Sequence, residues 1–412
     1  MKKQLRKDIL TNLQNKKIVI FGAGIMAHEF YEMYQDQLDF AFCVTNDSKE
    51  WGEKRFCQAL DVKQYSQQQM KGKYYIVVCI SLAFDSVASQ LVCDDYTVFQ
   101  DFVDYKVAEA VLERKKLAFF YGTCILRDTY YLLERVPAFT EEYVGVFTQT
   151  HAKKTILDIQ RLYYGKELCD AYVYARKLMD VGEAYYMQKK DLPPDCIMIG
   201  VSNVTFHGYW PQALQNLEYN EHWLFDVMAP FDTYFWHLMY AREDVNITRL
   251  VQEGKSPQQV YQIVSAEDFY SEKEIRKHLR VCFKTLEMAE RGLEVTVGDF
   301  IKDNYQKERL YQDFTHLRKS VLWEYAKRIL DHLEVKEKDL AQIIAAAPEY
   351  VHRGSDTPIY PSVARALGLE WVDENTRYEV LTGKGVQLMT FQQYVLHYAE
   401  YMQKALEIEK GW

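Results

Sequence analysis

Two apolar runs, each followed by a glycine turn and a segment with helical spacing, dominate the hydrophobic pattern of the chain. They cover residues 17–21 and 117–121. Runs in which nearly every residue is apolar predict strands that are buried on both faces of a parallel sheet. After each turn, apolar residues three or four apart predict a helix. We therefore expect two sheets, each with a strand–turn–helix unit near its centre.

Other apolar runs extend the two expected sheets. Strands are predicted at 40–44, 74–81, 143–147 and 195–200, and helices at 28–34, 125–136, 272–291, 319–333, 336–347, 361–369 and 390–408. The fold class is therefore α/β. An N-terminal, Rossmann-like domain with a parallel sheet is expected over residues 1–110. A larger α/β/α domain with a helical C-terminal part is expected over residues 115–412, after a charge cluster at 113–116.

Composition narrows the class of protein. The chain has 412 residues, 48% of them hydrophobic and 26% charged, which predicts a folded protein of at least two domains. The net charge is −9 and no long basic run occurs, so nucleic acid is not an expected partner. No apolar run is long enough to span a membrane. The eight cysteines form no CxxC pair and no zinc pattern, which indicates reduced thiols, a cytoplasmic location and no metal.

The first glycine turn fits the pattern G-x-G-x-x-A. Gly22 allows the turn, Gly24 lets a pyrophosphate approach the backbone, and Ala27 allows close packing of the helix on the strand. The stretch resembles Rossmann-like domains attached to sugar-modifying transferases and methyltransferases, in which the second strand ends in D-N-D. Here Thr45 replaces the first Asp, and Asp47 matches the second. Two interpretations of this domain stay open. It binds NAD(P) or another nucleotide, or it is a packing module without a ligand.

The second glycine turn carries a cysteine. Gly122, Thr123 and Cys124 separate the strand at 117–121 from the helix that follows. The N-terminus of a helix presents unpaired N–H groups and favours an anion, so a thiolate, an oxyanion or a phosphate would be stabilised there. A buried structural cysteine is the alternative.

Two later segments carry the remaining candidate chemistry. Residues 201–211 are rich in polar and aromatic side chains and follow a predicted strand, where ligands bind in open α/β sheets. They include Asn203 and His207. Asp313 and His316 form a D-x-x-H motif, in which the carboxylate can orient one imidazole nitrogen while the other acts as a base.

The order of these motifs resembles that of GDSL/SGNH hydrolases. Two differences are that Cys124 occupies the position of the nucleophilic serine and that Asn203 lies one residue away from the position of the asparagine in the G-x-N-D motif of that family. A closer resemblance is to the WcbI-type family of capsule polysaccharide biosynthesis. It rests on Gly122-Thr123-Cys124, Phe206-His207-Gly208-Tyr209-Trp210-Pro211, Arg309-Leu310-Tyr311 with His316, and Pro358-Ile359-Tyr360-Pro361. Thr123 replaces the family's usual Asn, and Leu317 its usual Pro.

This resemblance implies an SGNH-like domain that binds coenzyme A and moves an acyl group, with acetyl as the first candidate, onto a capsule or exopolysaccharide sugar precursor. Gly122, Thr123, Arg127 and Arg318 would contact coenzyme A. Either Cys124 is the nucleophile, with Asn203 at the oxyanion and His316 as its base, or a sugar hydroxyl attacks acetyl-CoA directly with His207 or His316 as base. An esterase or deacetylase, and a non-catalytic module that binds a nucleotide sugar or coenzyme A, are the alternatives. Whether the chain forms a homodimer is left open by the sequence.

Overall fold

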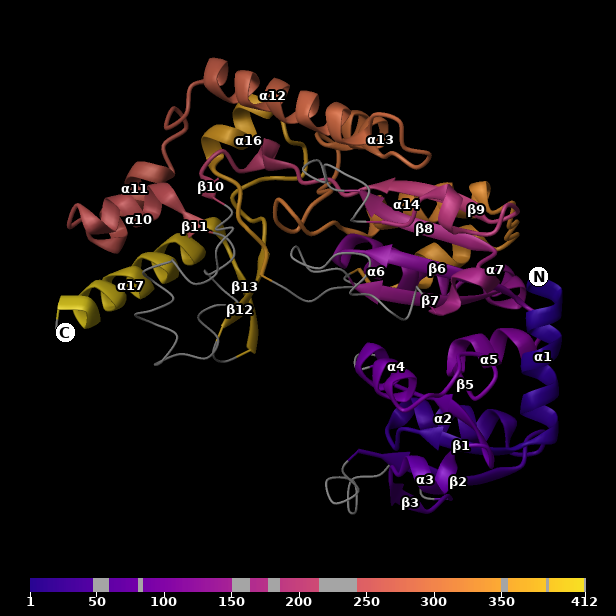
Figure 1. Cartoon of the computed structure of the whole chain (residues 1–412). Coiled ribbons are helices and arrows are strands. Elements are labelled where there is room, and N and C mark those ends of the chain that lie inside the picture. Colours follow the sequence, from indigo (N-terminus) through magenta and orange to yellow (C-terminus); the bar gives the residue numbers. More distant parts are fainter. Residues whose placement is uncertain are drawn as a thin grey trace. The chain divides into compact units, whose positions relative to one another are not determined.

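The computed structural model describes residues 1–46, 59–80, 84–149, 164–176, 186–214, 243–349, 355–382 and 385–410. The chain divides into two compact units (Figure 1). The first unit comprises residues 1–201 and 328–343, and the second comprises residues 202–327 and 344–412. The first unit thus continues across residues 110–115, where the sequence predicts the boundary between two domains. The division into domains at 1–110 and 115–412 stays a prediction.

The first sheet is fully parallel and has the strand order β3-β2-β1-β4-β5. This is the order of the first five strands in doubly wound dinucleotide-binding sheets. The apolar run at its centre is explained by burial on both faces, because Ile18 and Ile20 enter one hydrophobic cluster while Val19 and Phe21 enter another. The strands are β1 (Lys17–Phe21), β2 (Phe40–Thr45), β3 (Val62–Gln64), β4 (Tyr74–Val78) and β5 (Phe102–Asp104).

Helices cover both faces of this sheet. Ile9 of α1 and Phe30 of α2 pack in the cluster that holds Ile18, whereas Phe84 and Leu91 of α4 pack in the cluster that holds Val19. The helices of this region are α1 (Lys2–Asn15), α2 (Ile25–Tyr34), α3 (Gln67–Met70), α4 (Phe84–Cys93) and α5 (Tyr105–Leu112).

The second sheet has the strand order β7-β6-β8-β9, and β6 pairs in parallel with both β7 and β8. The predicted strands at 117–121, 143–147 and 195–200 are present, and β8 is an additional strand that the apolar pattern did not indicate. The elements are β6 (Lys116–Gly122), α6 (Cys124–Leu133), α7 (Pro137–Glu142), β7 (Tyr143–Gln149), β8 (Ala171–Arg176) and β9 (Ile197–Ser202).

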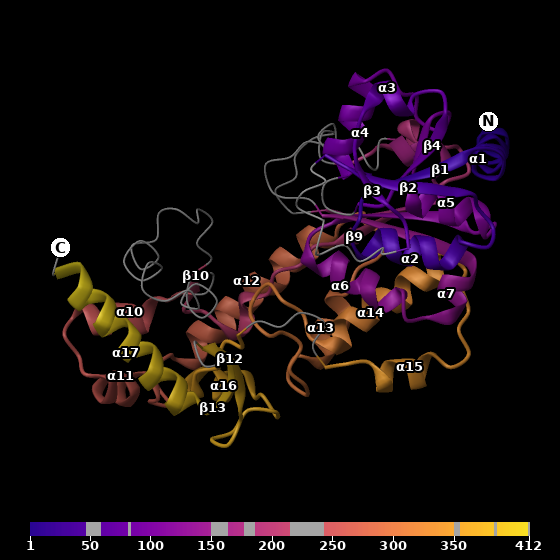
Figure 2. The same ribbon diagram turned by 90° about the horizontal axis from the view of Figure 1, so that it is seen from below.

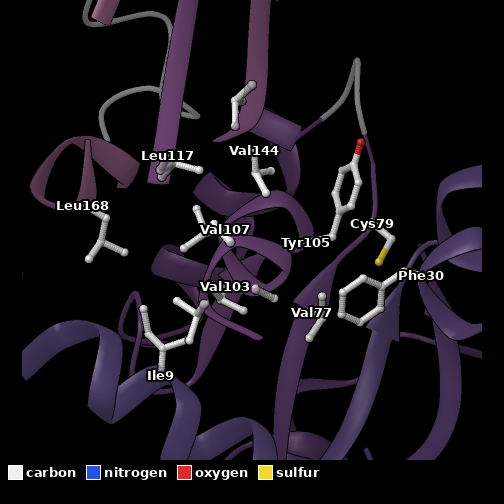
Figure 3. Close-up of a cluster of buried hydrophobic side chains, with 14 of the residues drawn as sticks. Ile9, Phe30, Val77, Cys79, Val103, Tyr105, Val107, Leu117, Val144 and Leu168 are labelled. Carbon is white, nitrogen blue, oxygen red and sulfur yellow. The ribbon is translucent and has the colours of Figure 1, made fainter. Parts of the chain in front are cut away.

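One hydrophobic cluster joins the two sheets of the first unit (Figure 3). Val77 and Val103 of the first sheet belong to the same cluster as Leu117 and Val144 of the second. The N-terminal helix α1 contributes Ile9 to this cluster and is also held by ion pairs to Asp170, which directly precedes β8 of the second sheet. Lys2 and Arg6 both lie 2.8 Å from carboxylate oxygens of Asp170. The continuous core explains why the first unit includes both sheets.

The second unit is mainly helical. In it, α17 packs against α10 and α11 (Figure 2). Short antiparallel pairs β10–β11 and β12–β13 complete it. Its elements, in chain order, are β10 (Ala213–Leu214), β11 (Glu243–Asp244), α10 (Val245–Gln252), α11 (Pro257–Val264), α12 (Glu272–Glu290), α13 (Gly298–Asn304), α16 (Pro361–Leu367), β12 (Tyr378–Thr382), β13 (Gly385–Met389) and α17 (Phe391–Lys410). Two further helices are α14 (Lys319–His332) and α15 (Leu340–Ala346).

The predicted α/β fold class with a helical C-terminal part is confirmed. The predicted helix at 336–347 is wrong in its first turn, since α15 begins only at Leu340. The Glu337 carboxylate accepts hydrogen bonds from the backbone N–H groups of Ala138 and Asp339, and such bonds compete with helix formation. In the described ranges no helix is long and apolar enough to cross a membrane, and no group of His, Cys, Asp and Glu is arranged to hold a metal ion.

Candidate functional site

The turn that carries Cys124 lies between β6 and α6. Thr123 is the N-cap of α6 with an extended backbone, and Cys124 is the first residue of the helix and is half-buried. Gly122 is required by close packing, because a Cβ atom there would lie 2.8 Å from Cβ of Ala175 on the neighbouring strand β8. The predicted position of Cys124 at a helix N-terminus is therefore present. Its part in catalysis stays a prediction.

Arg127, one turn further along α6, is engaged within the helix. Its Nε and Nη2 atoms each lie 2.9 Å from Oδ1 of the buried Asp128. Because this carboxylate balances the guanidinium charge, Arg127 is a weaker anion site than its position in the sequence suggests. The predicted contact with coenzyme A stays a prediction.

The D-x-x-H motif forms a closed loop in the second unit, which we call the Asp313 loop (residues 311–317). Tyr311 and Leu317 pair as an antiparallel bridge, and the N–H of Gln312 donates to the carbonyl of His316. Asp313 is 3% exposed. Its Oδ1 accepts the N–H groups of Thr315 and His316, and its Oδ2 lies 2.7 Å from Nδ1 of His316. The motif thus places a fixed, buried carboxylate against one imidazole nitrogen, as the sequence predicts.

The segment that carries His207, residues 203–211 (the His207 loop), packs directly on the Asp313 loop. The N–H of Phe206 donates to the carbonyl of Phe314 at 2.8 Å, and the His207 ring stacks on the Phe314 ring with centroids 4.2 Å apart. Phe206, Tyr209 and Trp210 are fully buried. These large anchors hold the loop rigidly, while His207 itself is half-buried.

The two loops therefore bring three of the predicted catalytic residues together in the second unit: His207, Asp313 and His316. Asn203 follows β9 at the start of the His207 loop and is half-buried. Its predicted role in holding an oxyanion stays a prediction. The neighbouring Ser202 is fully buried and its hydroxyl is bonded to Glu290 and Tyr325.

A model of a known protein family matches the part of the chain in which these two loops lie. Residues 169–338 match the family model described as "Polysaccharide biosynthesis enzyme WcbI". Because of this match we call residues 169–338 the WcbI-type region. The resemblance predicted from the sequence motifs is thereby confirmed, and the match covers both β8 and the Asp313 loop. No curated protein matches the chain.

A solved structure of WcbI, described as a novel polysaccharide biosynthesis enzyme, has a similar fold. The likeness covers 72% of this chain and 93% of that one, with a TM-score of 0.53 and 17% sequence identity. The solved form is described as the native protein without a disulfide bond between coenzyme A and one of its cysteines. At this identity the likeness concerns the fold alone.

Arg318, directly after the Asp313 loop of the WcbI-type region, is held by a buried carboxylate. Its Nη2 lies 3.0 Å from Oδ1 of Asp356, and Nη1 of Arg309 lies 2.9 Å from Oδ2 of the same group. The backbone N–H of Glu379 donates to this carboxylate as well. This network fixes the chain behind the Asp313 loop, and a contact of Arg318 with coenzyme A stays a prediction.

Two groups in the WcbI-type region were missed by sequence reasoning. Nε2 of His278 lies 2.8 Å from the carbonyl oxygen of His207 and 3.5 Å from Sγ of Cys282. Burial raises the pKa of the Cys282 thiol to about 11, so this thiol stays protonated near neutral pH. His278 therefore positions the His207 loop. The i, i+4 spacing of His278 and Cys282 on α12 was the only sequence signal.

The second missed group is Glu290, at the end of α12. Charged and apolar residues alternate along 272–291, a pattern that is typical of a solvated helix face, but the Glu290 side chain is not part of such a face. Its carboxylate accepts hydrogen bonds from the N–H groups of Val297 and Gly298 and from the Ser202 hydroxyl. Burial raises the pKa of Glu290, although these bonds act in the opposite direction.

The N-terminal glycine turn has the expected form. Gly22 has a positive φ of 129°, and a Cβ atom there would lie 2.8 Å from the carbonyl oxygen of Cys79. Gly24 is the N-cap of α2, and Ala27 is a fully buried residue of that helix. Asp47 lies outside the described residues. Nucleotide binding by this turn stays a prediction.

Proposed function

We propose that the chain transfers an acyl group, with acetyl as the first candidate, from a coenzyme A thioester to a sugar hydroxyl of a capsule or exopolysaccharide precursor. The observation that carries the proposal is the hydrogen bond between Asp313 and His316 in a loop of the WcbI-type region. The presence of coenzyme A in the description of the solved WcbI supports the choice of acyl donor.

The Asp313–His316 pair is suited to general base catalysis. An ionised carboxylate can only accept hydrogen bonds, so Nδ1 of His316 carries the proton that points to Asp313. In the neutral imidazole the lone pair then lies on Nε2, which is the atom that would take a proton from the attacking hydroxyl. Asp313 would stabilise the imidazolium that forms, and its bonds to two backbone N–H groups keep it in place.

Two routes can use this base, and we propose the covalent one. The Cys124 thiol loses its proton to a base and attacks the thioester carbonyl carbon. A new carbon–sulfur bond forms, the bond from this carbon to the coenzyme A sulfur breaks, and coenzyme A leaves as its thiol with the proton from Cys124. A sugar hydroxyl then attacks the acyl-Cys124 carbonyl, the carbon–oxygen bond forms, and the Cys124 sulfur leaves. The hydroxyl proton is taken up by a base and ends on the Cys124 sulfur, which restores the thiol. In the other route the hydroxyl attacks the coenzyme A thioester directly.

The start of α6 fits an acyl donor. Thr123 is its N-cap, and the first N–H groups of a helix have no partner within the helix itself, so this end of α6 is suited to a developing oxyanion. By contrast, the Arg127 guanidinium is paired with Asp128, and the Arg318 guanidinium is held by Asp356, a carboxylate that it shares with Arg309. We therefore assign recognition of the thioester to Gly122, Thr123 and Cys124 rather than to these arginines.

The experiment compares the full chain with three variants in an acetyl-CoA assay that follows release of the coenzyme A thiol in the presence of sugar acceptors. His316→Asn is expected to lower kcat by about 10²–10⁴-fold, the usual contribution of a general base. Asp313→Asn is expected to lower kcat and to move the acid limb of the pH profile to lower pH, because removing the carboxylate destabilises the imidazolium. His28→Asn on α2 is the matched control. Full activity of His316→Asn would overturn the proposal.

A further inference from the structure

A cavity of about 640 Å³ lies in the second unit. Its walls come from α11, from the segment that runs from the start of α16 into β12, and from the first turn of α17. This volume is within the range of small-molecule sites. Apart from Tyr261, all residues that line it lie beyond residue 338, where the match to the WcbI family model ends. The cavity is therefore a feature of the C-terminal part of this chain.

The inner surface of the cavity is apolar and partly aromatic. Its lining includes the buried side chains of Ile359 and Leu369 and the half-buried rings of Tyr261 and Phe391. The centroids of these two rings are 6.4 Å apart and their planes meet at 50°. The negative face of an aromatic ring attracts the polarised C–H groups on the flat side of a pyranose. The aromatic wall thus fits a sugar ring better than it fits an extended alkyl chain.

Polar side chains that are not used by the fold surround this apolar surface. Glu374, Asn375 and Gln392 are exposed, and none of the hydrogen bonds found in the described part of the chain uses their side chains. The loop that presents the first two is ordered by Asp373, whose Oδ1 accepts the N–H of Asn375 and the hydroxyl of Thr376. Carboxylate and amide groups can together accept from and donate to sugar hydroxyls, which both donate and accept.

The charge of the cavity restricts its ligand. Asp373 and Glu374 contribute two negative charges, and Arg365 contributes one positive charge that already lies 3.7 Å from Glu267. The resulting field is negative and opposes anionic ligands. The phosphates of coenzyme A and the carboxylate of a uronic acid are therefore disfavoured, whereas neutral sugars and amino sugars are accepted.

We propose that this cavity is a saccharide-binding site for a neutral or amino-sugar ring. Phe391 and Tyr261 provide the stacking faces, and Glu374, Asn375 and Gln392 contact the hydroxyls. That the bound saccharide is the acyl acceptor rests on the proposed function. Binding itself requires no acyl transfer, so the site can be tested even if the chain transfers no acyl group.

The test is saturation-transfer NMR and titration calorimetry on the full chain with methyl glycosides of glucose, galactose, N-acetylglucosamine and glucosamine. Glucuronic acid is the anionic comparison, and coenzyme A is titrated in a separate arm. At least one neutral or amino sugar is expected to bind, and glucuronic acid is expected to bind at least about tenfold more weakly because of the negative rim. Coenzyme A is expected not to compete with the bound sugar.

Three variants locate the binding. Phe391→Ala is expected to weaken sugar binding about tenfold, the loss of one aromatic contact. Asn375→Ala is expected to weaken it severalfold and touches no packed side chain, so it decides the question if Phe391→Ala fails to fold. Glu400→Gln, on an exposed position of α17, is the matched control and should bind as the unmodified chain does. Absence of binding by every sugar, displacement of the sugar by coenzyme A, or undiminished binding by Asn375→Ala would each overturn the proposal.

Discussion

Two strand–turn–helix junctions in the first unit share almost the same backbone but carry different side chains. The N-cap of α2 is Gly24, with φ −85° and ψ −165°, and the N-cap of α6 is Thr123, with φ −89° and ψ −169°. Each junction follows a strand that has a parallel neighbour on both sides, and a glycine in close contact with its surroundings lies where the strand ends, directly after β1 and as the last residue of β6. The two junctions nevertheless offer a ligand different chemistry.

The difference lies in what the turn adds to the backbone. The turn before α2 consists of Gly22, Ala23 and Gly24, so it can offer only backbone N–H groups to a ligand. The turn before α6 leads directly into Cys124, which adds a thiol at the same place relative to the helix. One backbone arrangement thus presents N–H groups alone at one sheet, and N–H groups together with a thiol at the other.

The largest effect is expected from removing the thiol. Cys124→Ala should lower acyl transfer by about 10³-fold or more, because a covalent route loses its nucleophile. Cys124→Ser should be similarly impaired, while Gly24→Ala at the other junction should transfer at the unmodified rate. Initial rates with acetyl-CoA measure all three. Normal turnover by Cys124→Ala would assign the reaction to direct attack by the sugar hydroxyl.

Replacing the two strand-end glycines by alanine should show how the junctions differ in packing. Gly22→Ala is expected to cost about 2–4 kcal/mol of unfolding free energy, because φ is positive and the new Cβ would meet the Cys79 carbonyl oxygen. Gly122→Ala should cost less, about 1–3 kcal/mol, because φ is not positive at Gly122, although the new Cβ would lie 2.8 Å from Cβ of Ala175, which the backbone of β8 holds in place. Urea unfolding provides the comparison, and a larger cost at Gly122 would contradict it.

The smallest effect concerns ligand binding by the first junction. NAD, NADP or a UDP-sugar is expected to raise the melting temperature of the full chain, with a stabilisation of up to about 2.7 kcal/mol at a hundredfold excess over Kd. Gly24→Val should abolish the shift, because its side chain would occupy the place of the pyrophosphate. If none of these nucleotides shifts the melting temperature, the first junction serves packing alone.

Sequence reasoning succeeded where burial is complete and the contacts are local. The strands β1 and β6 were predicted because both of their faces are covered, which leaves an unbroken apolar run. By contrast, β8 was missed because tyrosines replace aliphatic residues in it. Tyr172 is fully buried, and its hydroxyl oxygen accepts a hydrogen bond from the N–H of Met187. The spacing of apolar residues does not predict such a contact.

The candidate site follows the same rule. Asp313 and His316 are three residues apart, so their spacing alone was enough to predict the hydrogen bond between them. The packing of His207 on Phe314 and the burial of Glu290 depend on segments that are distant in the sequence. Charge and spacing alone made Glu290 look like part of a solvated helix face, because nothing in them indicates that residues 297–298 fold back onto it.

The central claim is that an acyl group moves from a coenzyme A thioester to a sugar hydroxyl with His316 as the base. Its most direct test is mass spectrometry of the products formed from isotope-labelled acetyl-CoA and the saccharide that binds best. We predict that the label appears as an ester on the sugar and that His316→Asn abolishes this product. Label found only in free acetate, or a labelled sugar formed equally by His316→Asn, would contradict the account.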